Sequence, residues 1–288
     1  MRMTGLEGHR LFLQSAQKGG HSEREARALW HIWLMDRLAC TRAQWMLDER
    51  EPMAQDREKR LREDAIRLAQ GVPIQYVTEV SHFANVTLCI GPGVLIPRPE
   101  TEAWVMEWTL KLPRNARVMD VCSGSGCMGL AVAQARPDAA ITAVEWSSEA
   151  LLWLHKNAEP YKNAEVLCWD ALTDPPARPA SFDLLMSNPP YIPQNESSTL
   201  ALHVRDHEPS EALFVPVDNP LVFYRSLIAW GAFLLKPQGW ITLECHTQKA
   251  EEVRSLFVGP GWASVAVQTD IFDRPRFVSA QWLGIFTP

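Results

Sequence analysis

The chain has 288 residues, of which 47% are hydrophobic and 22% are charged, a composition typical of an ordinary soluble globular protein. This length predicts one or two domains, and we favour two. No apolar run approaches the ~20 residues of a membrane helix, and the opening segment MRMTGLEGHR lacks an apolar signal core, so we expect a cytoplasmic protein with no membrane segment. The net charge of -6 argues against binding along a nucleic-acid backbone, which needs a basic face, and favours small-molecule or protein partners.

The cysteines and histidines do not form a recognisable metal or disulfide pattern. There is no C-x-x-C pair, and no histidines cluster at metal-ligand spacing. We therefore predict no bound metal, and free thiols at all six cysteines: Cys40, Cys89, Cys122, Cys127, Cys168 and Cys245.

The first part of the chain has helical patterns. Residues 1 to 80 carry 13 Lys+Arg and 12 Asp+Glu, which leaves 28 - 13 = 15 and 34 - 12 = 22 for residues 81 to 288. SERE (22–25) and TRAQ (41–44) both have the form of a capping box at a helix start. A charged helix over about 57 to 69 is expected to end at Gly71, with Pro73 just beyond. We predict a helical domain over residues 1 to 79, whose tryptophan and leucine stripes form its core.

Two short apolar runs follow this helical part. HFANVTLCI (82–90) and GVLIP (93–97) meet at a GPG segment and have the pattern of strands. We predict that residues 80 to 98 form a β-hairpin linker between two domains.

From residue 99 onward, strand-like runs alternate with helix-like segments. The alternation predicts an α/β domain over residues 99 to 288, with a mostly parallel sheet covered by helices on both faces. A late segment, RPRFVSAQWLGIF (274–286), is expected to add an antiparallel strand. The other strand candidates are RVMDV (117–121), AITAVE (140–145), EVLCWD (165–170), FDLLMS (182–187) and WITLEC (240–245).

A glycine-rich loop, DVCSGSGCMG (120–129), follows the first of these strands and opens a helix. Glycines allow a ligand close to the backbone, and the start of a helix offers unpaired N–H groups. Gly124, Gly126 and Gly129 spell G-x-G-x-x-G, and Glu145 ends the next strand about 20 residues later, as in dinucleotide-binding enzymes. Taken alone, the loop fits such an enzyme nearly as well as any other, and a purely structural tight turn is the remaining alternative.

Two acidic residues end strand candidates on the same sheet. Glu145 is placed to accept hydrogen bonds from both hydroxyls of a ribose, because an ionised carboxylate offers only acceptors. Asp170 is placed to accept a hydrogen bond from an adenine amino group. For either residue the alternative is a solvated strand end.

The segment SNPPYIPQNE (187–196) ends the fourth strand candidate in an asparagine followed by two prolines and a tyrosine. Ligands of open parallel sheets bind beyond the strand carboxyl ends near the switch point, so Asn188 should lie beside the glycine-rich loop. Pro189 and Pro190 fix φ and remove two backbone donors while their carbonyls stay free. The result is a rigid bend rich in acceptors, although N-P and P-P pairs also mark ordinary turns.

Such a bend suits an NH2 group that is to be methylated. An amide nitrogen is a poor nucleophile, and we expect the Asn188 side-chain oxygen and the Pro189 carbonyl to hold its two N–H groups while Tyr191 stacks on its plane. Positioning of this kind supplies effective molarities of roughly 10⁵ to 10⁸ M, so no strong general base is required.

These motifs together carry a resemblance. The chain resembles the HemK/PrmC family of release factor glutamine methyltransferases over nearly its whole length. The matching segments are GVPIQY (71–76), VLIPRPETE (94–102), DVCSGSG (120–126), SNPPYI (187–192), EPSEALF (208–214) followed by FYR, and RPRFV (274–278).

The resemblance implies N5-methylation of the glutamine in the Gly-Gly-Gln motif of peptide chain release factors, with S-adenosyl-L-methionine as methyl donor. It also implies a helical N-terminal domain that docks the protein substrate, joined by a hairpin to a class I, Rossmann-like methyltransferase domain with a seven-stranded sheet. We expect a monomer that does not bind nucleic acid directly.

The resemblance also assigns roles to individual residues. The catalytic bend would hold the glutamine, with Arg98 and Glu100 lining the same cleft as substrate-binding residues. The catalytic residues would be Asn188, Pro189, Pro190 and Tyr191. The cofactor would be bound by Asp120, Cys122, Ser123, Gly124, Ser125, Gly126, Glu145, Asp170 and Asn188.

Two positions depart from the family pattern. A glycine is common where this chain has Cys122, so we expect the backbone there to avoid the conformation that only glycine tolerates. An aspartate is common where it has Glu145, whose longer side chain still reaches a ribose. We predict that Cys122 and Cys127 are structural, because no neighbour in sequence supplies an activating base.

The same residues also suit three other functions. NPPY suits an adenine-N6 methyltransferase of nucleic acid, although the acidic balance argues against it. G-x-G-x-x-G with Glu145 suits an NAD-dependent oxidoreductase. The charged helical part suits a protein-binding module without catalysis.

Overall fold

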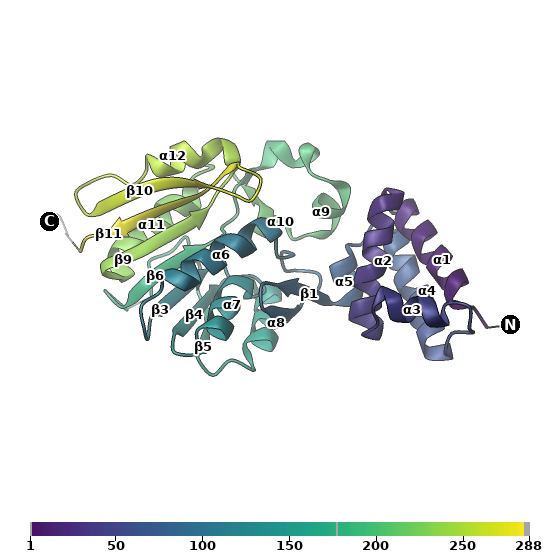
Figure 1. Cartoon of the computed structure of the whole chain (residues 1–288). Helices are drawn as coiled ribbons and strands as arrows, with labels where there is room; N and C mark the ends of the chain where they lie inside the picture. Colours follow the sequence, from purple (N-terminus) through teal and green to yellow (C-terminus); the bar gives the residue numbers. More distant parts are fainter. Residues whose placement is uncertain (1, 177, 285–288) are drawn as a thin grey trace. The chain divides into compact units, whose positions relative to one another are not determined.

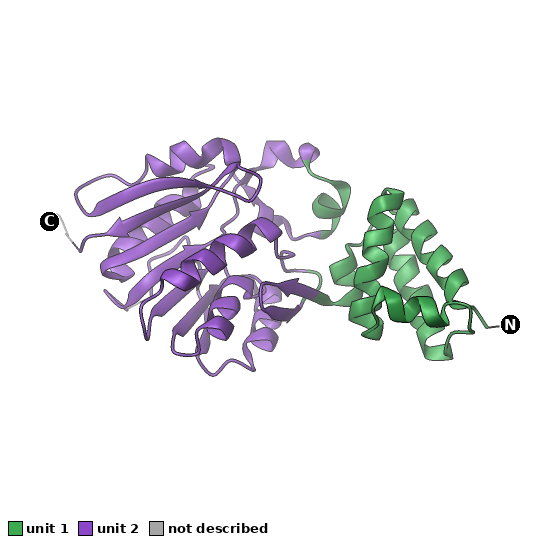
Figure 2. Cartoon of the chain, in the orientation of Figure 1, with its two compact units in different colours: residues 1–80, 90–92, 200–207 green, residues 81–89, 93–199, 208–288 purple. Residues whose placement is uncertain are grey.

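The computed structural model describes residues 2–176 and 178–284. By its internal contacts the chain divides into two compact units, which Figure 2 draws in different colours. The helical unit comprises residues 1–80, 90–92 and 200–207, and the α/β unit comprises residues 81–89, 93–199 and 208–288. The domain boundaries expected after residues 79 and 98 stay predictions.

Both capping boxes predicted in the helical unit are confirmed. Ser22 and Glu25 cap α2, and Thr41 and Gln44 cap α3. A third box, formed by Thr4 with a glutamate, starts α1 and was missed in the sequence. The helices of this unit are α1 (Gly5–Lys18), α2 (Glu23–Leu38), α3 (Arg42–Asp48), α4 (Gln55–Ala69), α5 (Ile74–Thr78) and α9 (Leu202–His207) (Figure 1).

The predicted tryptophan and leucine stripes do form the core of this unit. The rings of Trp30 and Trp33 stack with centroids 5.1 Å apart, and both side chains are buried. The Trp33 indole N–H donates to the buried Asp64 carboxylate at 2.8 Å, and Arg37 pairs with the same carboxylate at 3.0 Å. The buried acid is therefore fully hydrogen-bonded, as a charge in a core must be.

The α/β unit contains a seven-stranded sheet with the order β10-β11-β9-β6-β3-β4-β5. Strands β3, β4, β5, β6 and β9 run parallel, whereas β11 is antiparallel to both of its neighbours. The bounds are β3 (Arg117–Val121), β4 (Ala140–Glu145), β5 (Ala164–Cys168), β6 (Phe182–Ser187), β9 (Leu235–Glu244), β10 (Trp262–Thr269) and β11 (Pro275–Trp282). The mostly parallel sheet predicted from the alternation is confirmed.

Most strand predictions hold, with three differences. The strand expected over 165–170 ends at Cys168, so Asp170 lies in the turn beyond it. The strand expected over 240–245 begins earlier, at Leu235. The late antiparallel strand is confirmed as β11, while residues 285 and 286 of that segment lie outside the described part of the chain. Strand β10 was missed, because it is a half-buried edge strand with two register shifts and no clear period-2 pattern.

The hairpin expected between the domains is narrower than predicted. Strands β1 (Val80–Phe83) and β2 (Val86–Cys89) pair with each other, but the GVLIP run forms no strand. Pro97 has no N–H to donate to a ladder, and the Ile96 N–H donates to the Glu208 carboxylate at 3.1 Å. This segment therefore belongs to a loop fixed by a buried acid.

Helices pack on both faces of the sheet. Helix α7 contacts β3 and β4, α8 contacts β5, α11 contacts β9, and α12 contacts β10 and β11 (Figure 1). The helices are α6 (Pro99–Lys111), α7 (Cys127–Ala135), α8 (Ser148–Ala158), α10 (Ser210–Leu213), α11 (Val222–Leu234) and α12 (Ala250–Arg254). Among the described residues, none of these or the other helices is long and apolar enough to cross a membrane.

The strand order places a switch point at β3. From β3 the chain adds β4 and β5 on one side and then crosses to add β6 and β9 on the other. Val121 at the end of β3 pairs with Ser187 at the end of β6. The segments that follow these two residues therefore leave the sheet side by side, where open α/β sheets bind their ligands.

Candidate active site

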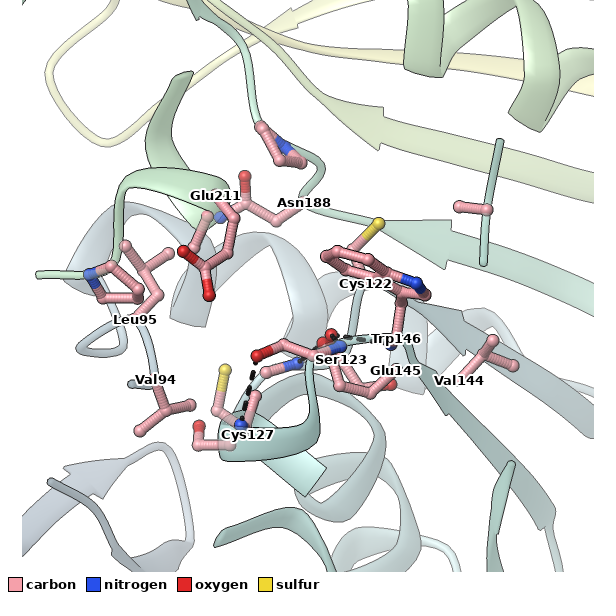
Figure 3. Close-up of a pocket in the computed structure, with 18 of the residues that line it drawn as sticks. Val94, Leu95, Cys122, Ser123, Cys127, Val144, Glu145, Trp146, Asn188 and Glu211 are labelled. Atoms are coloured by element: carbon pink, nitrogen blue, oxygen red, sulfur yellow. Dashed lines mark hydrogen bonds between the residues drawn. The ribbon is translucent and has the colours of Figure 1, made fainter. Parts of the chain in front are cut away.

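A cavity of about 390 Å³ lies beyond the carboxyl ends of the central strands. Its size is in the usual range for a small-molecule site. It brings together the loop after β3, the end of β4 at Glu145, and Asn188 after β6. Figure 3 shows the labelled side chains around it, with Val94 and Leu95 contributed by the segment before α6.

The glycine-rich loop is closed by hydrogen bonds to the backbone and to a side chain of β4. The Ser123 N–H donates to the Val144 carbonyl at 3.0 Å, and the Gly124 N–H donates to a Glu145 carboxylate oxygen at 2.8 Å. Gly124 and Gly126 have φ of +54° and +83°, and Gly126 immediately precedes α7. The glycines therefore permit the turn itself, and Ser123 and Gly124 line the cavity.

Cys122 corrects one expectation. Its φ is +59°, so the backbone adopts the left-handed conformation that we expected a non-glycine residue to avoid. The hydrogen bonds of the next two residues to β4 fix the path of the loop, and they offset the roughly 1 to 2 kcal/mol that a left-handed residue costs.

Cys122 and Cys127 belong to this loop and line the cavity, and their predicted structural role stays a prediction. Burial, together with the nearby Glu145 carboxylate, raises the pKa of the Cys122 thiol far above its ordinary range. Burial likewise raises the pKa of the Cys127 thiol. Both sulfurs therefore stay protonated and poorly nucleophilic. In the described part of the chain all six cysteines are free, which confirms the predicted thiols.

Glu145 organises the loop as well as lining the cavity. Its Oε1 accepts the N–H groups of Trp146 and Ser147 at 2.7 and 2.8 Å, and its Oε2 accepts that of Gly124. A carboxylate has about four acceptor sites, so capacity remains on Oε2. That oxygen can accept a ligand hydroxyl without breaking the loop contacts, and the predicted contact to both ribose hydroxyls stays a prediction.

Asp120 lies beneath the loop and does not line the described cavity. Its Oδ2 accepts the Gly129 N–H of α7 at 2.8 Å, whereas its Oδ1 is buried without a hydrogen-bond partner. Burial, with a smaller contribution from the Glu145 charge, raises the pKa of this carboxyl from 3.8 to about 7. A role of Asp120 in cofactor binding stays a prediction, and from this position it would act through α7.

The raised pKa of Asp120 predicts how stability depends on pH. Between its ordinary pKa of 3.8 and about 7, the folded protein holds a proton here that the unfolded chain has released. This contribution is fully present below the ordinary pKa and is lost as the pH rises through about 7. In Asp120→Asn the loss should disappear, so wild type should lose about 1.4 kcal/mol of unfolding free energy per pH unit relative to the variant over this window. Denaturant unfolding of both proteins at several pH values measures the difference.

Asp138 provides a control of opposite sign. Its partner Arg136 lowers the pKa of this exposed carboxyl, so its contribution is present at neutral pH and is lost as the pH falls. Relative to Asp138→Asn, wild type should therefore lose stability only on acidification. A wild-type curve parallel to that of Asp120→Asn from about pH 4 to 7 would contradict the buried, protonated carboxyl.

The bend after β6 is held where the sequence predicted. The Ser187 hydroxyl donates to the Val121 carbonyl at 2.6 Å, which joins the start of the bend to the glycine-rich loop. Asn188 and Pro190 line the cavity, whereas Pro189 is buried outside it. In the described part of the chain no hydrogen bond is formed by the Asn188 side chain, so its amide is available to a ligand.

Tyr191 lies outside the cavity. Its ring packs against the core around β9 and α11, and its hydroxyl donates to a Glu244 carboxylate oxygen at 3.3 Å. Burial raises the pKa of this hydroxyl, so it is neutral. Its stacking on a substrate amide stays a prediction, and the ring would have to leave its present packing to do so.

The remaining predicted residues divide between the cavity and its support. Arg98 lines the cavity and pairs with the buried Glu208 at 2.8 Å. Glu100 does not line it and pairs with Arg274 at 3.2 Å. Asp170 lines it, with one oxygen accepting the Leu172 N–H at 2.8 Å. Ser125 also lines the cavity, but Gly126 does not.

Several lining residues were missed in the sequence. Trp146 and Trp169 line the cavity with 60% and 39% of their surface exposed, so both rings offer faces to a ligand. Their only sequence signal is that each is adjacent to a predicted acidic residue. Glu211 and Phe223 also line the cavity, from the EPSEALF and FYR segments that carried the resemblance.

The charge of the lining tests which cofactor fits. Glu145, Asp170 and Glu211 supply three carboxylates, and the guanidinium of Arg98 is already paired with Glu208. Such a lining suits a cationic ligand and repels the anionic pyrophosphate of a dinucleotide. The walls also offer aromatic faces and carboxylate acceptors, so they fit S-adenosyl-L-methionine, which carries an adenine, a ribose and a sulfonium cation. In residues 2–176 and 178–284, no group of three or more His, Cys, Asp or Glu is arranged to hold a metal ion.

Comparison with known proteins places the chain in a family. The model of the PrmC N-terminal domain matches residues 10–78, and that of the methyltransferase small domain matches residues 102–205. A release factor glutamine methyltransferase of Streptomyces coelicolor is 38% identical over 215 residues, 73% of this chain and 75% of that protein. The one of Mycolicibacterium smegmatis is 39% identical over 74% of this chain and 75% of that protein, and the one of Bacteroides thetaiotaomicron is 32% identical over 78% and 81%.

These similarities run through both the helical part and the α/β part of the chain. They confirm the resemblance drawn from the motifs, and together with the seven-stranded, mostly parallel sheet they confirm the class I methyltransferase fold. The chain belongs to the family of release factor glutamine methyltransferases.

Proposed function

We propose that this chain transfers a methyl group from S-adenosyl-L-methionine to the side-chain nitrogen of a glutamine in peptide chain release factors, at the Gly-Gly-Gln motif. The curated relatives carry the name of this activity. The observation that carries the proposal for this chain is the pairing of Val121 with Ser187, which brings Asn188 into the same cavity as Glu145.

The residues of the site would divide the work. Glu145 and Asp170 would hold the nucleoside part of the cofactor, with the backbone around Ser123 and Gly124 against its amino-acid part. When bound, the cofactor supplies a methyl group carried on a sulfonium sulfur. The rest of the cofactor leaves as a neutral thioether. The Asn188 side-chain oxygen and the Pro189 carbonyl would accept the two N–H groups of the glutamine amide and keep its plane fixed. The amide proton is lost to water after the transfer.

The charge of the lining favours this function over the alternatives. Three carboxylates attract a sulfonium cation and disfavour both the pyrophosphate of NAD and the phosphates of a nucleic acid. We therefore propose release factors as the protein partners, without direct binding of nucleic acid, and the enzyme as a monomer. Because release factors act in translation, we also propose a cytoplasmic location.

The test is direct. The enzyme is incubated with S-adenosyl-L-methionine carrying a labelled methyl group and with a bacterial release factor, and the release factor peptides are analysed by mass spectrometry. We expect one added methyl group on the glutamine of Gly-Gly-Gln. A release factor in which that glutamine is replaced serves as the control. A label that persists on this control, or appears on another residue, contradicts the substrate assignment.

A further inference from the structure

Glu244 is a buried acid that the proposed reaction does not use directly. It ends β9 and is 2% exposed, yet it does not line the cavity. The Thr101 hydroxyl donates to its Oε2 at 2.6 Å, and the Tyr191 hydroxyl donates to its Oε1 at 3.3 Å. An Arg276 N–H donates to the same Tyr191 hydroxyl at 3.4 Å.

These contacts connect three segments that lie far apart in the sequence. Thr101 is in the first turn of α6, Tyr191 follows the bend after β6, and Arg276 is on β11. They belong to the motifs VLIPRPETE, SNPPYI and RPRFV, of which the first two contribute residues to the cavity, Thr101 among them, whereas RPRFV contributes none. Two of the three motifs are bonded directly to the Glu244 carboxylate, and RPRFV is connected to it through the Tyr191 hydroxyl.

The bend that contains Asn188 is anchored at both ends by hydroxyl groups. At its start the Ser187 hydroxyl is bonded to the carbonyl of Val121. At its end the Tyr191 hydroxyl is bonded to Glu244. Between them Pro189 and Pro190 fix φ, so the short bend has few torsions through which to relax. A displacement at Tyr191 is therefore transmitted to Asn188.

A buried carboxyl group at position 244 is unfavourable for stability, so its presence suggests that the geometry of its hydrogen bonds matters. Burying an acid costs free energy, and an apolar side chain of similar volume is often as stable or more stable. Burial raises the pKa of the Glu244 carboxyl, and the hydrogen bond from Thr101 and the charge of Arg276 oppose that shift. The hydroxyls of Thr101 and Tyr191 both point their hydrogens at this side chain, one at each oxygen. This fixes the orientation of the Tyr191 side chain more strictly than packing alone, and burial with hydrogen bonding keeps water out of the contact.

Building on the proposed function, we propose that Glu244 is a positioning residue for methyl transfer, which holds Asn188 in place by fixing the hydroxyl of Tyr191. The Thr101 hydroxyl orients the carboxylate, and Arg276 orients the tyrosine from the other side. Glu244 itself touches neither substrate nor cofactor.

The test compares Glu244→Gln and Tyr191→Phe with wild type and with the double variant. Glutamine keeps the size of the side chain but presents an N–H2 group to one of the two hydroxyls. We expect each single variant to lower kcat about tenfold while the KM for release factor and the Kd for S-adenosylhomocysteine change less than about twofold. The double variant should be no worse than either single variant, because both remove the same contact.

Asp183→Asn is a matched control. Asp183 lies on β6 at the opposite end from Ser187, pairs with Lys236 at 2.7 Å and accepts the Arg117 N–H at 2.7 Å, and is outside the cavity. Its substitution should lower the melting temperature and leave kcat unchanged. If Glu244→Gln behaves in the same way, Glu244 has only a structural role. If the effects of the two site variants on kcat multiply, the two residues act independently, and Glu244 does not act through Tyr191.

Hydrogen exchange provides a readout that does not depend on turnover. Glu244→Gln should increase amide exchange in peptides that contain residues 187–193, whereas Asp183→Asn should not. If wild type methylates no release factor but Glu244→Gln increases the exchange as expected, the proposed function is wrong, whereas the positioning of the bend by Glu244 is supported. If the exchange is unchanged in Glu244→Gln, Glu244 does not position the bend, even if wild type is active.

Discussion

Asn188→Ala should lower kcat for release factor methylation by about 10- to 100-fold. Asn188 lines the cavity, and in the proposed site its side-chain oxygen accepts one N–H of the substrate amide, so its removal leaves that N–H without an acceptor. An unpaired buried polar group costs about 1 to 3 kcal/mol, and this cost applies to the geometry of the transition state. The measurement is steady-state kinetics with labelled S-adenosyl-L-methionine.

The affinity for the cofactor separates this effect from loss of the fold. The contacts that close the glycine-rich loop do not involve the Asn188 side chain, so the Kd for S-adenosylhomocysteine in calorimetry should change only a few fold. Asn195→Ala is a matched control, because Asn195 is an exposed asparagine shortly after the same bend. An Asn188→Ala enzyme with unchanged kcat rules out the proposed role of the amide oxygen.

Glu145→Ala should affect the other half of the site and weaken cofactor binding. The carboxylate accepts three backbone N–H groups, those of Gly124, Trp146 and Ser147, and each bond to a charged acceptor contributes about 1.5 to 3 kcal/mol. Its removal loosens the loop and also deletes the acceptor predicted for the ribose. We expect the Kd for S-adenosylhomocysteine to rise at least about tenfold and the melting temperature to fall.

Two comparisons make this prediction specific. Glu149→Ala removes an exposed acid from the first turn of the neighbouring α8, and should leave cofactor affinity nearly unchanged. Added S-adenosylhomocysteine should raise the melting temperature of wild type and of Glu149→Ala, but much less that of Glu145→Ala. If the ligand protects all three proteins equally, Glu145 is a solvated strand end, the alternative considered for it in the sequence.

The sequence identified the site better than it identified the supports of the site. The glycine-rich loop, Glu145 and NPPY are local patterns, because each ligand-facing group lies within a few residues of a strand end. Cys122 is a counterexample: its chemistry suggested an ordinary backbone conformation, but two hydrogen bonds to β4 impose φ of +59°. Local preference yields to long-range pairing where a loop is fixed at both ends.

Other residues were missed for the same reason. Trp146 and Trp169 resemble any exposed aromatic residue in the sequence, and their role in the lining depends on the neighbouring strands. Glu244 ends an apolar strand, as Glu145 does, so the pattern alone cannot distinguish a ligand-facing acid from one that is bonded to Thr101 and Tyr191. Strand β10 lies at the edge of the sheet, where weak burial leaves little periodicity.

The family, the α/β class and the identity of the groups available for methyl transfer can be predicted from the sequence, because motifs, hydrophobic alternation and caps are encoded by neighbouring residues. Which of those groups face the cavity cannot be predicted in this way. That depends on strand order and register: the pairing of Val121 with Ser187 brings Asn188 beside the glycine-rich loop, while the contact with Glu244 holds Tyr191 against the core. Such contacts join residues more than 50 positions apart, and no local pattern specifies them.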